Sequence, residues 1–142
     1  MARGAQDRPD DQQWPAAGVR LGLPEQGPGS VAGWGRRVFG IAVDWVLASL
    51  IGRVLLGDVL GPELGPLLVF GLMHVLLVST LGFSIGHFVA GIAVRRLDGR
   101  PVGLLRGSLR TLLLLLVIPA VVYDHDRRGL HDKAAEVVVL RR

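Results

Sequence analysis

The chain has 142 residues, half of them apolar, with a mean hydropathy of +0.45 and a formal net charge of +4. It has no cysteine, which excludes disulfides and thiolate metal sites. Its basic charge comes from fifteen arginines and one lysine. Because these arginines flank apolar runs, they indicate membrane topology and contact with anionic lipid headgroups rather than nucleic acid. The composition predicts one integral membrane domain of the all-α class, a small transmembrane helical bundle.

Residues 1–32 are predicted to form a disordered cytoplasmic tail. This segment has four prolines, several glycines and few large apolar side chains. It can therefore bury too little surface to offset the entropy of ordering the chain. It also lacks the apolar stretch of a secretory signal peptide. Residues 33–140 form the predicted transmembrane domain.

Two apolar runs, residues 38–56 and 64–83, are each long enough to cross about 30 Å of hydrocarbon. A third segment, residues 104–123, has a short apolar part and spans only if Arg106 and Arg110 snorkel to the interface. Arginines precede the first run and follow the second, which places the N-terminus in the cytoplasm of a multi-pass cell-membrane protein. Three full spans would export the basic C-terminal residues, so we favour a third segment that enters the membrane and returns.

Asp44 is the most informative residue, because a charged side chain inside a membrane span costs roughly 2.5–3.5 kcal/mol on insertion scales. Arg37 lies seven residues earlier, on the same helix face and about 10 Å away along the axis. Small residues on that face, Gly40, Ala48 and Gly52, indicate that it meets a neighbouring helix. The candidate partners of Asp44 are Arg37, His74, Arg127 and Arg128.

Two interpretations of Asp44 remain open. In the favoured one, an Arg37–Asp44 pair locks the bundle. In the other, Asp44 binds a proton or another cation, although a paired Arg37 would work against proton exchange. His74, near the middle of the second run, is expected to make a structural hydrogen bond, or alternatively to relay protons with Asp44.

Three sequence elements follow one another at fixed places relative to the apolar runs. They are Arg37-x-x-Gly40-x-x-x-Asp44; Ser84-Ile85-Gly86-His87 followed by Gly91-Ile92-Ala93-Val94 and Asp98-Gly99; and Arg127-Arg128-Gly129-Leu130-His131-Asp132, leading through Ala135 to a valine run. In this order they resemble the RDD family of small membrane proteins, named for one arginine and two aspartates, over residues 33–140.

The resemblance implies a fold more than a function, since ion transport is suggested for only some members of that family. Two positions depart from its pattern. His87 stands where the family usually has lysine, which makes charge at that position dependent on pH. Glu136 stands where glycine is common, which affects how the C-terminal strand is expected to pack.

The C-terminal part contains two His-Asp dipeptides, at residues 125–126 and 131–132, with side chains that can bind metals. The arginines between them repel a cation, so we predict a polar clamp in which Asp132 accepts hydrogen bonds from arginines at the cytoplasmic rim. Residues 88–94 and 137–140 either pair as a small β-ribbon on that side or each continue a helix.

No nucleophile–base set, phosphate-binding loop or convincing metal set is present in the sequence, so we predict neither an enzyme nor a cofactor. The favoured function is a membrane adaptor or accessory subunit, and the alternative is an oligomeric cation/proton transporter that uses Asp44. Expected partners are the lipid bilayer, a second copy of the chain, or another membrane protein. The candidate site residues are Arg37, Asp44, His74, His87, Arg128, His131 and Asp132.

Overall fold

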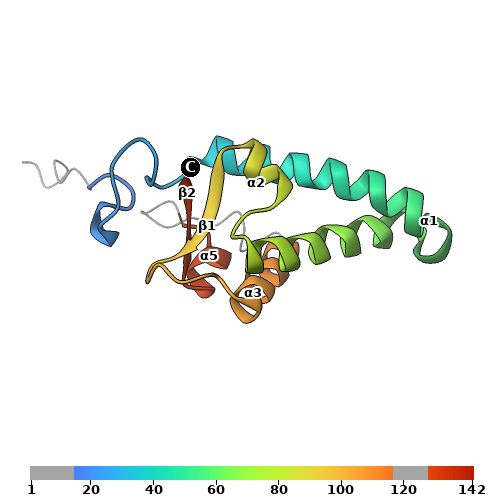
Figure 1. The fold of residues 1–142 in the computed structure, drawn as a ribbon. Coiled ribbons are helices and arrows are strands. Elements are labelled where there is room, and N and C mark those ends of the chain that lie inside the picture. Colours follow the sequence, from blue (N-terminus) through green and yellow to red (C-terminus); the bar gives the residue numbers. More distant parts are fainter. Residues whose placement is uncertain (1–14, 117–127) are drawn as a thin grey trace, which may run out of the picture.

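The computed structural model describes residues 15–116 and 128–142. A long helical hairpin extends to one side, and a small sheet with short helices closes its other end (Figure 1). The elements in chain order are η2 (Val19–Leu21), α1 (Trp34–Thr80), α2 (Ile85–Val89), β1 (Ile92–Arg96), α3 (Leu104–Leu115), α5 (Leu130–Ala134) and β2 (Val137–Arg141). The all-α prediction is therefore wrong in one respect, because two short strands accompany the helices.

Helix α1 is a hairpin of two arms, residues 34–60 and residues 62–80, which we call the first and second arm. The chain reverses at Gly61, whose φ of 80° and ψ of 169° are accessible essentially to glycine alone. Pro62 then starts the second arm, a position at which its missing N–H leaves no hydrogen bond unmade. At 1.5 Å per residue the arms are about 40 and 28 Å long.

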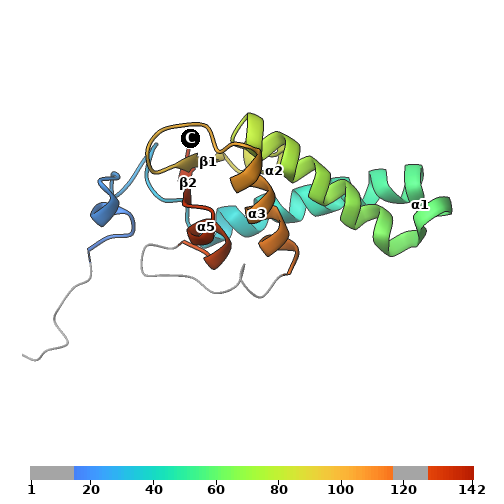
Figure 2. The ribbon, with the colours of Figure 1, turned by 90° about the horizontal axis from the view of Figure 1, so that it is seen from below.

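The arms touch most closely near the turn. A Cβ atom added at Gly52 would collide with the backbone of Gly65 and Pro66. Glycine is therefore required there for the backbones to meet, as in other close helix pairs of membrane proteins. Farther from the turn the arms diverge, and α3 packs against the second arm with Gly107 facing Ser79 (Figure 2).

Among the described helices, α1 is the one long and apolar enough to cross a membrane. Much of its outer surface consists of exposed apolar side chains, including Val46, Leu50, Val54 and Leu72. In water such a surface would be unfavourable, whereas a bilayer accommodates it. By contrast, α3 has 12 residues and is about 18 Å long, too short to cross alone. The remainder of the predicted third segment lies mostly outside the described residues.

Strands β1 and β2 pair antiparallel, with Ile92 opposite Arg141 and Arg96 opposite Val137. Of the two alternatives left open for these segments, the ribbon is the one observed, although residues 88 and 89 belong to α2 rather than to the first strand. Along its other edge β2 is bonded to residues 29–32, through Ala32 N–H to Val139 O at 2.8 Å and a bridge between Val31 and Leu140. Residues 30–32, placed in the tail by the sequence analysis, are thus buried beside β2.

This pairing places three distant parts of the chain at the same end of the hairpin. The segment that leads into α1, the strand that follows the second arm, and the last strand are hydrogen-bonded neighbours. Apolar side chains of these segments and of the elements around them form one core cluster: Ala32, Val78, Ala90, Ile92, Val94, Val102, Ala135, Val137 and Val139. The segment before α1 and the C-terminal strand therefore lie on one side of any membrane that the hairpin crosses.

Glu136, between α5 and β2, is the one described non-glycine residue with a positive φ, 56°. We expect Glu136→Gly to stabilise the protein by about 0.5–1 kcal/mol, because glycine adopts this conformation without steric cost. The loss of the exposed ion pair with Arg106 offsets only part of this gain. Thermal unfolding in detergent measures the change. Glu136→Ala is the control, since it loses the ion pair and keeps the backbone strain; equal stability of the two variants would contradict the explanation.

Candidate functional site

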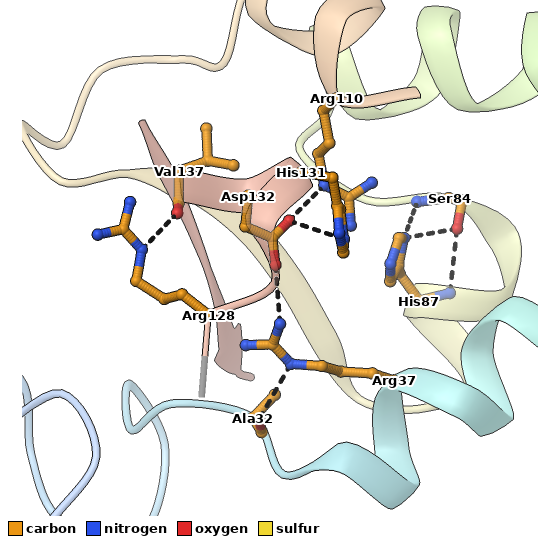
Figure 3. A network of polar contacts seen from close by, with 9 residues as sticks. All are labelled: Ala32, Arg37, Ser84, His87, Arg110, Arg128, His131, Asp132 and Val137. Carbon is orange, nitrogen blue, oxygen red and sulfur yellow. Dashed lines mark hydrogen bonds and ion pairs between the residues drawn. The ribbon is translucent and has the colours of Figure 1, made fainter. Parts of the chain in front are cut away.

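The first polar cluster is built around Asp132 of α5, which is fully buried (Figure 3). Arg37 Nη1 of α1 donates to Asp132 Oδ2 at 2.7 Å, and Arg110 Nε of α3 donates to Asp132 Oδ1 at 2.8 Å. His131 Nε2 lies 3.3 Å from Asp132 Oδ1. One carboxylate therefore ties together three helices, in the manner predicted for a polar clamp.

The electrostatics of this cluster keep Asp132 ionised. Burial alone would raise the pKa of its carboxyl, but Arg110, His131 and Arg37 act in the opposite direction and bring the pKa to about 2. A charge as deeply buried as this is tolerated because it is paired and hydrogen-bonded. Cluster one, as we call Arg37, Arg110, His131 and Asp132, is therefore a structural lock.

This geometry corrects the favoured pairing of Arg37 with Asp44. Although both residues lie on one face of α1, the Arg37 guanidinium points toward the strand end of the hairpin, where its Nε also donates to Ala32 O at 3.1 Å. The same guanidinium cannot also reach a carboxylate two helical turns deeper. Among the candidate partners in the described part of the chain, His74 is the one beside Asp44.

The second polar cluster contains Asp44 and His74 from the two arms of α1, with Ser84 and His87 at α2. All four side chains are buried, and Asp44 and His74 have no exposed surface. Asp44 Oδ1 accepts a hydrogen bond from Gly86 N–H at 2.6 Å, and Oδ2 accepts one from the Ser84 hydroxyl. His74 Nε2 lies 3.4 Å from the same Oδ2. We call these four residues cluster two.

Local sequence explains how α2 reaches Asp44. Ser84 caps α2, accepting from His87 N–H, and the His87 ring accepts in return from Ser84 N–H, forming a capping box. Gly86 lets this turn approach α1, because a Cβ atom there would collide with Gly40 O and lie 2.8 Å from the Asp44 carboxyl carbon. The Ser-Ile-Gly-His element thus positions two donors on the Asp44 carboxylate, the Ser84 hydroxyl and the Gly86 amide.

Cluster two holds fewer protons than its contacts require. His74 Nδ1 donates to Phe70 O at 3.2 Å, since a carbonyl can only accept, and a neutral His74 therefore presents a lone pair at Nε2 toward Asp44 Oδ2. Within the described residues this nitrogen has no hydrogen-bond partner. The contact between a lone pair and a carboxylate oxygen is repulsive unless a proton or another cation lies between them.

On the other side of Asp44, the hydrogen bonds of Ser84 depend on the tautomer of His87. Ser84 Oγ contacts both Asp44 Oδ2 and His87 Nδ1, the latter at 2.6 Å, yet a hydroxyl has one proton to donate. With the ring proton on Nε2, His87 Nδ1 accepts from Ser84 N–H at 3.2 Å. Burial, and then the nearby charge of Arg110, lowers the pKa of His87 well below its usual value, so its ring is neutral. With its proton on Nδ1, the neutral ring can donate to Ser84 Oγ, so the unsatisfied contact is the one between His74 and Asp44.

The sequence-predicted residues thus divide into two groups and one outlier. Arg37, His131 and Asp132 meet in cluster one, whereas Asp44, His74 and His87 meet in cluster two. Arg128 belongs to neither, because its Nε donates to Val137 O at 3.2 Å. The dipeptide at residues 125–126, weighed as half of a metal site, lies outside the described residues, as does Arg127.

Two residues of these clusters were not among the predicted site residues. Arg110 was interpreted as a snorkelling residue, although its place within an otherwise leucine-rich helix is a signal of a buried partner. Ser84 was quoted as part of a motif, and its spacing to His87 is the pattern of a capping box. Neither signal specifies Asp44 or Asp132 as the partner, since those contacts depend on how distant elements pack.

Comparison with known proteins agrees with these motifs. The family model of the RDD family matches residues 31–136, which include both clusters and strand β1 and end just before β2. No curated protein matches the chain. No solved structure matches it either. On the match to the family model, which covers well over half of the sequence, the chain belongs to the RDD family.

Proposed function

We propose that this RDD-family membrane protein binds a proton or small cation at cluster two and moves it across the membrane as an oligomer. The observation that carries the proposal is the lone pair of His74 Nε2 facing the fully buried carboxylate of Asp44 at 3.4 Å. Positive charge is needed there, and no arginine contact to Asp44 is present among the described residues.

The division of labour between the clusters supports this choice over a purely structural Asp44. The structural role expected of an Arg37–Asp44 pair is filled by Arg37, Arg110 and Asp132. A second buried carboxylate without a cationic partner costs stability, and intramembrane carboxylates of this kind usually serve ion or proton pathways. The transporter therefore becomes the first proposal, ahead of the adaptor that the sequence alone favoured.

The proposed topology is a multi-pass protein of the cell membrane with its N-terminus in the cytoplasm. The strand end of the hairpin has most of the described basic residues, while the turn end has Asp58, Glu63 and a single arginine, Arg53. That asymmetry supports a cytoplasmic strand end. Reporters fused at either terminus are expected to be cytoplasmic, and an external C-terminal reporter would contradict this arrangement.

The transport proposal includes an oligomer, because the hairpin and the short α3 of the described part of the chain cannot enclose a pathway by themselves. The apolar groove between the second arm and α3, lined by residues such as Leu68, Leu72 and Leu109, offers a surface for a second copy or for lipid. A protein that is monomeric in mild detergent and in nanodiscs would contradict the transport proposal.

The experiment is proteoliposome flux. We expect internal pH, followed with a trapped dye, to change when a Na⁺ or K⁺ gradient is imposed, and this change to fall to the empty-liposome level in Asp44→Asn. Asp58→Asn, an exposed carboxylate at the turn, is the matched control and should retain full flux. Equal flux from the wild type and Asp44→Asn, or none from a well-folded wild type, would overturn the proposal.

The adaptor is the second candidate, favoured by the exposed arginines at the strand end, including Arg36, Arg95, Arg100 and Arg142. A basic rim of this kind suits an acidic partner or anionic headgroups. Deleting residues 1–14 tests whether the N-terminal segment docks such a partner. Loss of a co-purifying membrane partner with unchanged flux would assign an adaptor role to this segment.

A further inference from the structure

We infer that cluster two is a binding site for one divalent transition-metal ion, with Asp44, His74 and His87 as its protein ligands. The inference rests on the proposed function, in which this cluster holds positive charge, and it names a class of metal ion that would bind there in competition with the proton. The three residues come from the first arm, the second arm and α2, so a bound ion would join all three elements.

The separations fit a common metal centre. One potential ligand atom from each of Asp44, His74 and His87 lies within 4.8 Å of the other two, and all three residues are buried. Two ligands at 2.0–2.1 Å from a tetrahedral ion are about 3.4 Å apart. His74 Nε2 and Asp44 Oδ2 are separated by 3.4 Å, so these two need no rearrangement.

The surroundings orient the ligands as in known metal sites. A ligating histidine commonly donates its other ring N–H to a backbone carbonyl, which fixes its tautomer, and His74 Nδ1 does so to Phe70 O. The Phe70 ring stacks on His74 with centroids 4.2 Å apart and limits its rotation. Asp44 is held by Gly86 N–H through Oδ1 and by the Ser84 hydroxyl through Oδ2, and Oδ2 also faces His74 Nε2.

The donor set selects the class of ion. Two imidazole nitrogens and one carboxylate suit borderline ions such as Zn²⁺, Fe²⁺ and Co²⁺. Na⁺, K⁺, Mg²⁺ and Ca²⁺ instead prefer several oxygen ligands, and within the described cluster only Asp44 and Ser84 supply side-chain oxygens. Asp132 offsets only part of the charge of the nearby Arg110, because it also pairs with Arg37.

The test is metal binding by the full-length protein in detergent after treatment with a chelator. Titration with ZnCl₂ in excess Na⁺ is expected to show about one equivalent bound, and bound Co²⁺ should give the intense visible absorption of a tetrahedral site. His74→Gln and His87→Gln should each weaken Zn²⁺ binding by roughly 100-fold or more, since removal even of an outer-shell partner costs 10–100-fold. Asp58→Asn, which changes an exposed carboxylate at the hairpin turn, is the control and should bind as the wild type does.

The outcomes separate this inference from the proposed function. Variants are compared only if their unfolding temperatures without metal match that of the wild type, and the Co²⁺ spectrum of the wild type provides a test that needs no variant. An octahedral Co²⁺ spectrum, or Zn²⁺ binding unchanged in both histidine variants, would overturn the inference. Flux that depends on Asp44 without Zn²⁺ binding would overturn the metal and keep the transporter, whereas tight Zn²⁺ binding without flux would support the metal site and overturn transport.

Discussion

Asp132→Asn is expected to lower the free energy of unfolding by about 3–5 kcal/mol, because it leaves Arg37 and Arg110 buried without their counter-charge. Thermal or denaturant unfolding in detergent measures the loss. Asp98→Asn is the control, because Asp98 forms a partly exposed ion pair with Arg96, and such pairs contribute about 1 kcal/mol or less. Similar losses of unfolding free energy in the two variants would show that cluster one is not a structural lock.

The same residue predicts a dependence on pH. The pKa of Asp132 is about 2 in the folded protein, below its ordinary value of 3.8, so the unfolded chain binds the proton more readily than the folded one. This stabilisation is fully present above about pH 4 and decreases as the pH falls toward 2. The unfolding temperature should therefore fall less steeply over this range in Asp132→Asn than in the wild type. Parallel profiles would contradict the assignment.

Gly52→Ala is expected to destabilise the hairpin by about 1–3 kcal/mol, since its added methyl group meets backbone atoms of Gly65 and Pro66 that cannot rotate away. Gly57→Ala is a control of opposite sign. It lies in the same arm with nothing near the added methyl, so it should stabilise by up to about 1 kcal/mol. The measurement is the unfolding temperature of each variant relative to the wild type. An unchanged unfolding temperature in Gly52→Ala would contradict the close contact between the arms.

Much of the fold follows from patterns local in sequence. The two apolar runs, the Gly61-Pro62 turn between them and the consecutive β-branched valines near the C-terminus carry their own signals of span, reversal and strand. Helix boundaries were less accurate, since α1 starts at Trp34 rather than at residue 38. The sequence carries no comparable signal that residues 29–32 join β2, because strand pairing depends on what packs nearby.

The sequence predicts most of the residues that form the candidate site, but it does not predict which of them contact one another. Asp44, Asp132 and Arg37 stand out because charged residues are costly in apolar surroundings. Which arginine meets which aspartate depends on the direction of long side chains and on contacts separated by up to 95 residues. Helical spacing places Arg37 and Asp44 on one face of α1. They nevertheless do not pair, because the long Arg37 side chain extends toward Asp132 instead.

The large separation in sequence between Arg37 and Asp132 has a consequence for biosynthesis. In the proposed topology, Arg37 reaches the membrane surface as the first arm is inserted, whereas its carboxylate partner is translated 95 residues later. Until then, water or lipid phosphate must neutralise the guanidinium, which requires that this end of the arm remain at the membrane surface during translation. The hairpin can therefore insert early, but its depth and rotation become fixed only when α5 docks beside it.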